Sequence, residues 1–149
     1  MDLFNKYKNK FTTPSEWKEA IVNEIGGFDL CLLLNCLKRA INYYDKSFEV
    51  NSFLYKDNKY WLDKDTRVGL FRLIDSGAKI ITLQLGEIYV DISADKLKEF
   101  LNKLEVYAGK CFSVTAKHLQ ALNNATSIEE ILALNYTEDY PDKIELTNE

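Results

Sequence analysis

The chain has 149 residues, of which 46% are hydrophobic and 28% charged, with two prolines and six glycines. This length suits one ordinary domain, which buries about 68–70% of the surface that its unfolded chain exposes. The composition excludes disordered and low-complexity proteins, and no internal repeat indicates a solenoid. We therefore expect a single domain over residues 1–149.

Charge and hydropathy exclude further classes. Residues 126–149 hold seven acidic side chains and one lysine, a charge of −6; the whole chain carries −4, so the remainder carries +2. Such a weakly positive body lacks the basic stripe of duplex-binding proteins, so we do not expect nucleic-acid binding. The longest apolar run, Leu30 to Leu34, is far shorter than the roughly 20 residues of a membrane span. The first ten residues lack the apolar stretch of a secretory signal, and three cysteines fit a reducing compartment, so we expect synthesis in the cytoplasm.

Two helices are predicted in the first third of the chain. Thr13-Pro14-Ser15-Glu16 has the pattern of a capping box with proline in the first turn, and its helix is expected to end at Gly26-Gly27. Apolar residues recur at helical spacing from Leu30 to Tyr44 and mark the buried face of a second helix. The two helices are expected to form an αα-hairpin.

A first β-hairpin is predicted from residues 53–62, with Asp57-Asn58 as its two-residue turn. That turn places Tyr55 opposite Tyr60 and Leu54 opposite Trp61.

A second hairpin carries the clearest local signal. Residues 81–85 and 88–92 alternate in polarity, and Gly86-Glu87 between them has the sequence of a type II′ turn. Turn and alternation agree on one register, in which Leu83 pairs with Val90 on the buried face and Gln84 lies on the other.

Three further helices complete the prediction. One runs from Lys64 to Asp75 with Asp63 or Asp65 as its cap, a long one of roughly 45 Å follows Ser93, and a short one follows Ser127. The chain is then expected to end in a polar tail. The fold class is α+β: an N-terminal helical hairpin, two β-hairpins forming a small antiparallel sheet, one long helix packed on it and a short C-terminal helix.

The residue types that carry chemistry are not grouped as catalysis or metal binding requires. Cys31 and Cys36 lie five residues apart on one predicted helix and point about 140° apart, so they cannot share a metal. Cys111 and His118 lie about 10.5 Å apart along another helix, too far for a nucleophile and its base unless another residue or a partner completes the pair. We predict no catalytic residue, no metal and no cofactor.

Acidic and aromatic clusters have ordinary structural interpretations. Glu129-Glu130 and Glu138-Asp139 are interpreted as solvated charge, and Asp63, Asp65 and Arg67 as a helix cap with a surface ion pair. The aromatic residues that could stack a ligand are interpreted as core; they are Tyr43, Tyr44, Tyr55, Tyr60 and Trp61.

The segment Tyr60–Leu70, YWLDKDTRVGL, leads from an aromatic strand into a helix start. It resembles a family of domains of unknown function encoded among bacteriophage virion genes, especially in phages of gut bacteria. The similarity covers about residues 53–146 and leaves residues 1–50 outside it. It continues through Thr82 to Ile92, Leu104 to Ala108, Cys111-Phe112, Thr115 to His118 and Ile128 to Pro141.

The resemblance implies a structural protein of the virion, in a tail, neck or capsid-accessory position, with no catalytic residues. Its expected partners are other virion proteins or copies of itself in an oligomeric assembly, without a small-molecule substrate. A small intracellular regulator or inhibitor of a host or phage protein is the alternative, and an enzyme assembled at an oligomer interface is a third hypothesis.

The first eleven residues are the candidate partner-docking site. A helix this short is unstable alone in water, so the segment needs a surface to order it. It either folds back on its own domain, or docks on a neighbouring subunit or another virion protein with its aromatics in apolar pockets and its lysines beside carboxylates; membrane or nucleic-acid attachment is a third choice. The residues concerned are Phe4, Tyr7 and Phe11 at helical spacing, with Lys6, Lys8 and Lys10 between them.

Overall fold

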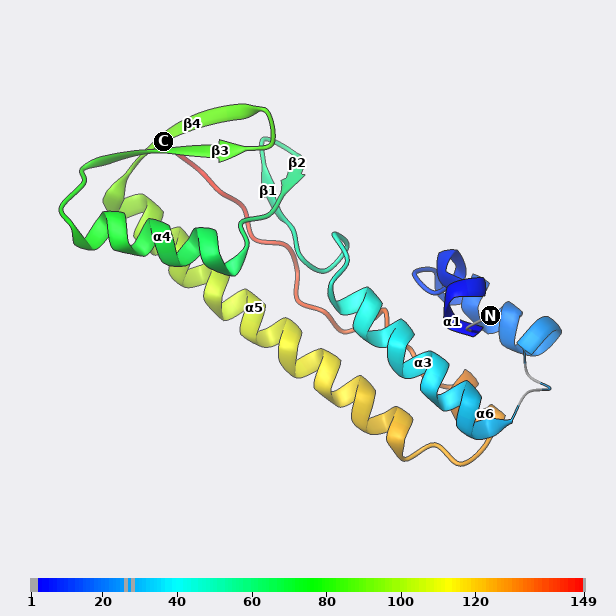
Figure 1. Cartoon of the computed structure of the whole chain (residues 1–149). Helices are drawn as coiled ribbons and strands as arrows, with labels where there is room; N and C mark the ends of the chain where they lie inside the picture. The colour runs from blue at the N-terminus through cyan, green and yellow to red at the C-terminus, as the bar shows by residue number, and fades with distance from the viewer. Residues whose placement is uncertain (1–2, 26, 28, 149) are drawn as a thin grey trace. The chain divides into compact units, whose positions relative to one another are not determined.

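The computed structural model describes residues 3–25, 27 and 29–148 and is mixed α+β, as predicted (Figure 1). A 3₁₀ turn, η1 (Lys8–Lys10), and a π-helical stretch, η2 (Ile21–Ile25), accompany the longer elements. The helices are α1 (Leu3–Lys6), α2 (Pro14–Ala20), α3 (Leu30–Asp45), α4 (Lys64–Asp75), α5 (Ala94–Asn123) and α6 (Ile128–Leu132), and the strands are β1 (Phe53–Tyr55), β2 (Asn58–Tyr60), β3 (Ile80–Leu85) and β4 (Ile88–Ser93).

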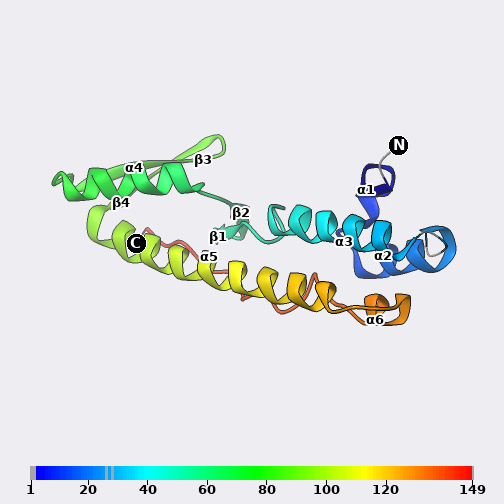
Figure 2. The same cartoon turned by 60° about the horizontal axis from the view of Figure 1, so that its bottom comes forward.

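The chain divides into two compact units. The first comprises the residues up to Val50 together with Lys110–Tyr140, and the second comprises Asn51–Gly109 together with the residues from Pro141 onward. Helix α5 is continuous and contributes to both, which Figure 2 shows as one unbroken ribbon. Beside this division, the expectation of a single domain over residues 1–149 stays a prediction.

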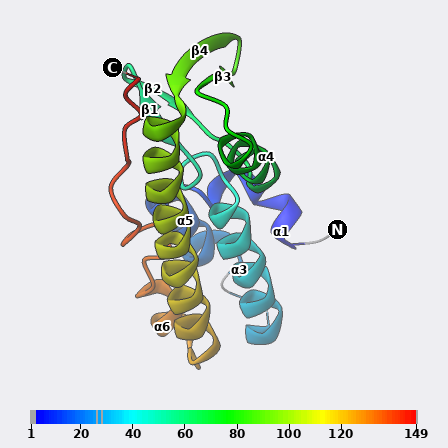
Figure 3. The same cartoon turned by 90° about the vertical axis from the view of Figure 1, so that its left-hand side faces the viewer.

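In the first unit, α3 and residues 110–123 of α5 run side by side (Figure 3). The core includes the predicted stripe of α3, and Trp17 of α2 packs its ring 5.0 Å from the ring of Tyr136. The residues that α3 buries are Leu33, Cys36, Leu37, Ala40, Ile41 and Tyr44.

The start of α2 differs from the prediction in one respect. Pro14 is the first helical residue, as predicted, but the Thr13 side chain makes no capping hydrogen bond. Proline has no N–H to satisfy, so the first turn has less need of a side-chain cap. The predicted helix end at Gly26-Gly27 falls partly outside the described residues; the helix continues through η2 to Ile25.

In the second unit, the register of β3 and β4 is the predicted one in every pair from Ile81–Ile92 to Leu85–Ile88. Gly86 has a φ of 62° and Glu87 is not among the residues with positive φ, which fits a type II′ turn. Leu83 is buried and Gln84 is exposed, as the alternation requires.

The first hairpin differs from its predicted register. Lys56 and Asp57, both with positive φ, form the turn, so Tyr55 pairs with Asn58 and Phe53 pairs with Tyr60. Tyr55 and Tyr60 therefore meet diagonally, with ring centroids 6.4 Å apart, instead of directly.

The reason for the shift lies outside the hairpin. The shorter ladder leaves Trp61 beyond β2, where its ring lies 6.3 Å from Tyr107 of α5. It also leaves β1 paired on its other side with the C-terminal segment. Packing on α5 and this extra pairing outweigh the local preference of Asp57-Asn58 for a turn.

The two hairpins form two separate two-stranded sheets, so the prediction that they share one small sheet was wrong. The long helix packs on the first of them, with the ring of Phe100 on α5 5.0 Å from that of Phe53 on β1. The predicted caps are confirmed: Asp63 accepts a hydrogen bond from the Thr66 N–H at 2.8 Å, and the hydroxyls of Ser93 and Ser127 accept from the first turns of α5 and α6.

Candidate functional site

The N-terminal segment that sequence analysis proposed for docking folds back on the first unit. Phe4 and Phe11 are buried, at 5% and 0% exposure, and their rings stack 5.6 Å apart. The ring of Tyr43 on α3 meets Phe4 edge-on at 5.7 Å, and the hydroxyl of Tyr136 donates to the Phe11 carbonyl oxygen. These aromatic side chains fill their own unit, so the structure does not support their insertion into pockets of a partner.

The polar members of the same segment lie at the surface of the unit. Lys6 and Lys8 are exposed, whereas Tyr7 and Lys10 are half-buried. Lys10 forms an ion pair with Glu24 at 3.2 Å, and the Lys8 Nζ lies 4.8 Å from the Tyr43 ring centroid. Lys6 and Lys8 thus remain accessible, and the groups that Lys8 and Lys10 contact, Tyr43 and Glu24, belong to the first unit.

A partly buried polar cluster joins three segments of the first unit. Thr115 of α5 is 6% exposed, and its hydroxyl lies 2.6 Å from a carboxylate oxygen of Asp45 and 2.7 Å from the hydroxyl of Tyr140. Burial, opposed in part by the hydrogen bond with Thr115, raises the pKa of Tyr140 to about 12. The cluster is satisfied by its own members, so we interpret it as a link between α3, α5 and the residues that follow α6.

His118 and the three cysteines lie in different surroundings. His118 is half-buried, with its Nε2 2.9 Å from the Glu138 carbonyl oxygen and its ring 5.9 Å from Tyr140. Cys31 is exposed, whereas Cys36 and Cys111 are buried, and burial raises the pKa of Cys36 to about 11. In the part of the chain that the structure describes, no three histidine, cysteine or acidic side chains are placed to hold a metal ion.

Arg67 occupies a different position from the predicted surface ion pair. Asp63 caps α4 as expected, but the Arg67 guanidinium is buried and donates 2.6 Å hydrogen bonds to Glu105 on α5 and to the Leu62 carbonyl oxygen. The guanidinium also lies 5.4 Å from the Trp61 ring centroid. Arg67 therefore links the start of α4 to α5 and lies against the ring of Trp61.

The predicted solvated acidic pairs are exposed, but Glu130 also has a local role. Its carboxylate accepts a hydrogen bond from the Thr126 N–H at 2.6 Å, one residue before the cap of α6. Of the aromatic residues interpreted as core, Tyr44 and Tyr55 are buried, Tyr60 and Trp61 are half-buried, and Tyr43 is 36% exposed.

The feature that sequence analysis missed is the C-terminal segment, which was expected to be a polar tail. Residues 144–146 pair with β1 in parallel: Leu54 N–H donates to the Ile144 carbonyl at 2.9 Å, and Leu146 N–H donates to the Leu54 carbonyl at 2.8 Å. The Leu146 side chain is 1% exposed, and the Lys143 ammonium donates to the Tyr107 hydroxyl at 2.9 Å. The alternation of Ile144, Glu145 and Leu146 was the available signal, and three residues are too few for it to predict a strand.

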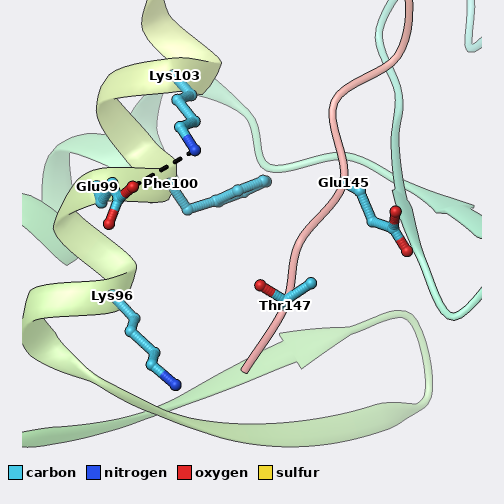
Figure 4. A pocket seen from close by; sticks show the side chains of 6 residues that line it. All are labelled: Lys96, Glu99, Phe100, Lys103, Glu145 and Thr147. Carbon is cyan, nitrogen blue, oxygen red and sulfur yellow. Dashed lines mark ion pairs between the residues drawn. The ribbon is translucent and has the colours of Figure 1, made fainter. Parts of the chain in front are cut away.

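Two cavities flank this segment. One of about 210 Å³ lies between the segment and α5, and Figure 4 shows the lysines of α5 on one side with Glu145 and Thr147 on the other. A second, of about 360 Å³, borders the end of β1. The first cavity is lined by Lys96, Glu99, Phe100, Lys103, Glu145 and Thr147.

β1 and the first half of α5 together make a strand-acceptor groove, which residues 144–146 occupy. We use this term for the edge of β1 at Leu54, the cavity residues on α5 and the buried position of Leu146. Its chemistry is recognition of extended backbone by hydrogen bonds, with one apolar side chain held inside and charged side chains at the rim.

Comparison with known proteins adds no family. Among the described residues, no helix has the length and apolar character needed to cross a membrane. The resemblance of residues 53–146 to a phage family stays a hypothesis. Neither a protein-family model, nor a curated protein, nor a solved structure matches this chain.

Proposed function

We propose that the protein is a non-enzymatic structural component of a bacteriophage virion, in the tail, neck or capsid-accessory apparatus, and that it acts through protein–protein contacts. The resemblance of residues 53–146 to a family encoded among virion genes supports a place in the virion. The surface of the second unit supports action through protein–protein contacts.

The observation that carries the mode of action is the open β3–β4 hairpin. Its inner face is buried except at Ile88, next to the turn, whereas its outer face presents Ile80 and Tyr89 at 65% and 69% exposure. Among the described residues the sheet has only these two strands, so both outer edges carry backbone groups that no third strand uses. An unpaired strand edge beside exposed apolar side chains is a template for association with another chain.

Mass spectrometry of purified particles of the phage that encodes this chain tests the proposal. We expect the protein in a fixed ratio to the major capsid protein. Replacing the exposed ring by Tyr89→Ser should lower that ratio without changing the melting temperature, whereas Lys98→Ser, an exposed change on α5, should leave it unchanged. A protein present in infected cells but absent from particles would overturn the proposal and favour the alternative of an intracellular regulator.

A further inference from the structure

The groove beside β1 is occupied in this structure by the chain's own C-terminal segment. The occupant contributes two backbone hydrogen bonds through one residue of β1, and one fully buried side chain, that of Leu146. This is the pattern by which sheets accept an added peptide strand: the backbone supplies affinity and a single side-chain pocket supplies specificity.

The other contacts of the occupant also come from its own side chains: Lys143 donates to the Tyr107 hydroxyl at 2.9 Å, and the Asn148 amide donates to the Asp91 carbonyl oxygen at 3.4 Å. Glu145 and Thr147, on either side of Leu146, are exposed, and the cavities of about 210 and 360 Å³ lie along the segment. Figure 4 shows Lys96 and Lys103 extending toward this space from α5, with Lys103 paired to Glu99 at 3.4 Å. An identical segment from another copy would make each of these contacts again, so the cost of releasing the segment is recovered once copies have exchanged it.

The backbone before the segment suits a hinge. Asp139 has a φ of 72°, in the left-handed region that non-glycine residues seldom adopt, and Pro141 restricts Tyr140 to extended conformations. Here the chain passes from the first unit to the second. A change of backbone angles at Asp139 would redirect the residues that follow it once the Tyr140 hydroxyl has left Thr115, whereas a change just after Pro141 would leave that hydrogen bond in place.

We propose that the strand-acceptor groove also takes the Ile144–Leu146 segment of a second copy of this chain, so that copies are joined by exchanged C-terminal strands. A second copy offers the sequence that the groove already fits, with Leu146 for the buried position and the backbone of residues 144–146 for the edge of β1. Exchange of an identical element needs no new surface, which makes it a low-cost route to assembly. This inference rests on the proposed function, because it names the partner of an assembly protein.

Disulfide trapping between two differently substituted copies tests the exchange. Leu54 and Glu145 face each other in the bridge, so one copy carries Leu54→Cys and the other Glu145→Cys, both with the exposed Cys31 replaced by serine. The two proteins are mixed under mild oxidation, and the covalent heterodimer is identified by its mass. The matched control replaces Lys59, which pairs with Leu54 from the opposite side, by cysteine.

We expect at least about tenfold more heterodimer from Leu54→Cys than from Lys59→Cys, because cysteines with Cα atoms more than about 7 Å apart cannot be bridged without backbone movement. Leu146→Asp on the Glu145→Cys copy should abolish the excess, whereas Thr147→Asp should retain it. A synthetic peptide of residues 141–149 should compete with the exchange.

A double variant with both cysteines in one chain controls for folding. If it closes its own disulfide while the mixed single variants give no more heterodimer than the Lys59→Cys control, the segment stays in its own copy and the inference is wrong. An excess that survives Leu146→Asp would also overturn it, since the buried side chain would then not matter. If the copies exchange strands but the protein is absent from particles, the proposed function is refuted and this inference stands. If particles contain the protein but its copies do not exchange strands, this inference is refuted and the proposed function stands.

Discussion

Phe11→Ala distinguishes an N-terminal segment that belongs to the first unit from one that serves a partner. The Phe11 side chain is fully buried and stacks on Phe4 with ring centroids 5.6 Å apart. The Phe11 carbonyl oxygen accepts a hydrogen bond from the Tyr136 hydroxyl. Removing a buried phenylalanine leaves a cavity and costs about 3–5 kcal/mol. Part of that cost is the aromatic pair itself, worth about 0.5–1.5 kcal/mol beyond the buried area.

For a chain of this size each kcal/mol lowers the melting temperature by about 2–4 °C, so we expect a decrease of about 6–20 °C. Differential scanning calorimetry and urea unfolding measure it. Lys8→Ala is the matched control, because it removes only a cation above the Tyr43 ring, an interaction of about 0.5–1 kcal/mol at an exposed site. A decrease below about 2 °C for Phe11→Ala, together with weaker incorporation into particles, would refute burial in the first unit and restore the docking hypothesis.

Three further predictions concern the second unit and the thiols. Leu83→Asp places a charge in the buried face of β3 and should cost about 3 kcal/mol or more, whereas Gln84→Asp on the exposed face should cost under about 1 kcal/mol; similar melting shifts would show that the register is wrong. Arg67→Ala leaves its two acceptors without their donor and should cost about 1–3 kcal/mol by urea unfolding, with Arg67→Lys restoring only part because an ammonium lacks the planar fork. Full recovery by lysine would contradict the paired geometry. Cys36 has its pKa raised by burial from 9.0 to about 11, so the unfolded chain loses this proton first and stability should fall as pH rises from about 9 to 11; Cys36→Ala should flatten that decline, and a thiol reagent at neutral pH should modify the exposed Cys31 first.

Several elements follow from the sequence because their determinants lie within a few residues of one another. The Gly86-Glu87 turn and the alternation around it agree on one register, which the structure has in every predicted pair. Asp63 and Ser127 cap their helices with oxygen atoms that reach N–H groups only three residues ahead. The stripe of α5 repeats over 30 residues, long enough for helical periodicity to be unambiguous.

The candidate groove depended on contacts that the sequence does not place together. The turn of the first hairpin moved to Lys56-Asp57 because β1 also pairs with residue 145, about ninety positions away, and because Trp61 packs on α5. The buried guanidinium of Arg67 bonds Glu105, 38 residues further on, instead of a neighbouring aspartate. The backbone of Phe11 is held by a hydrogen bond from Tyr136, 125 positions away.

The physical difference is one of range. A cap or a two-residue turn is decided by hydrogen bonds between neighbours, whose geometry the residue types nearly fix. The partner of an edge strand or a buried side chain is decided by competition among distant surfaces for the same apolar area and the same backbone donors. For residues 144–146 that competition gave a parallel bridge to β1 where local composition indicated a solvated tail. The reason is that Leu146 gains burial and Leu54 gains two hydrogen bonds only once the second unit has folded.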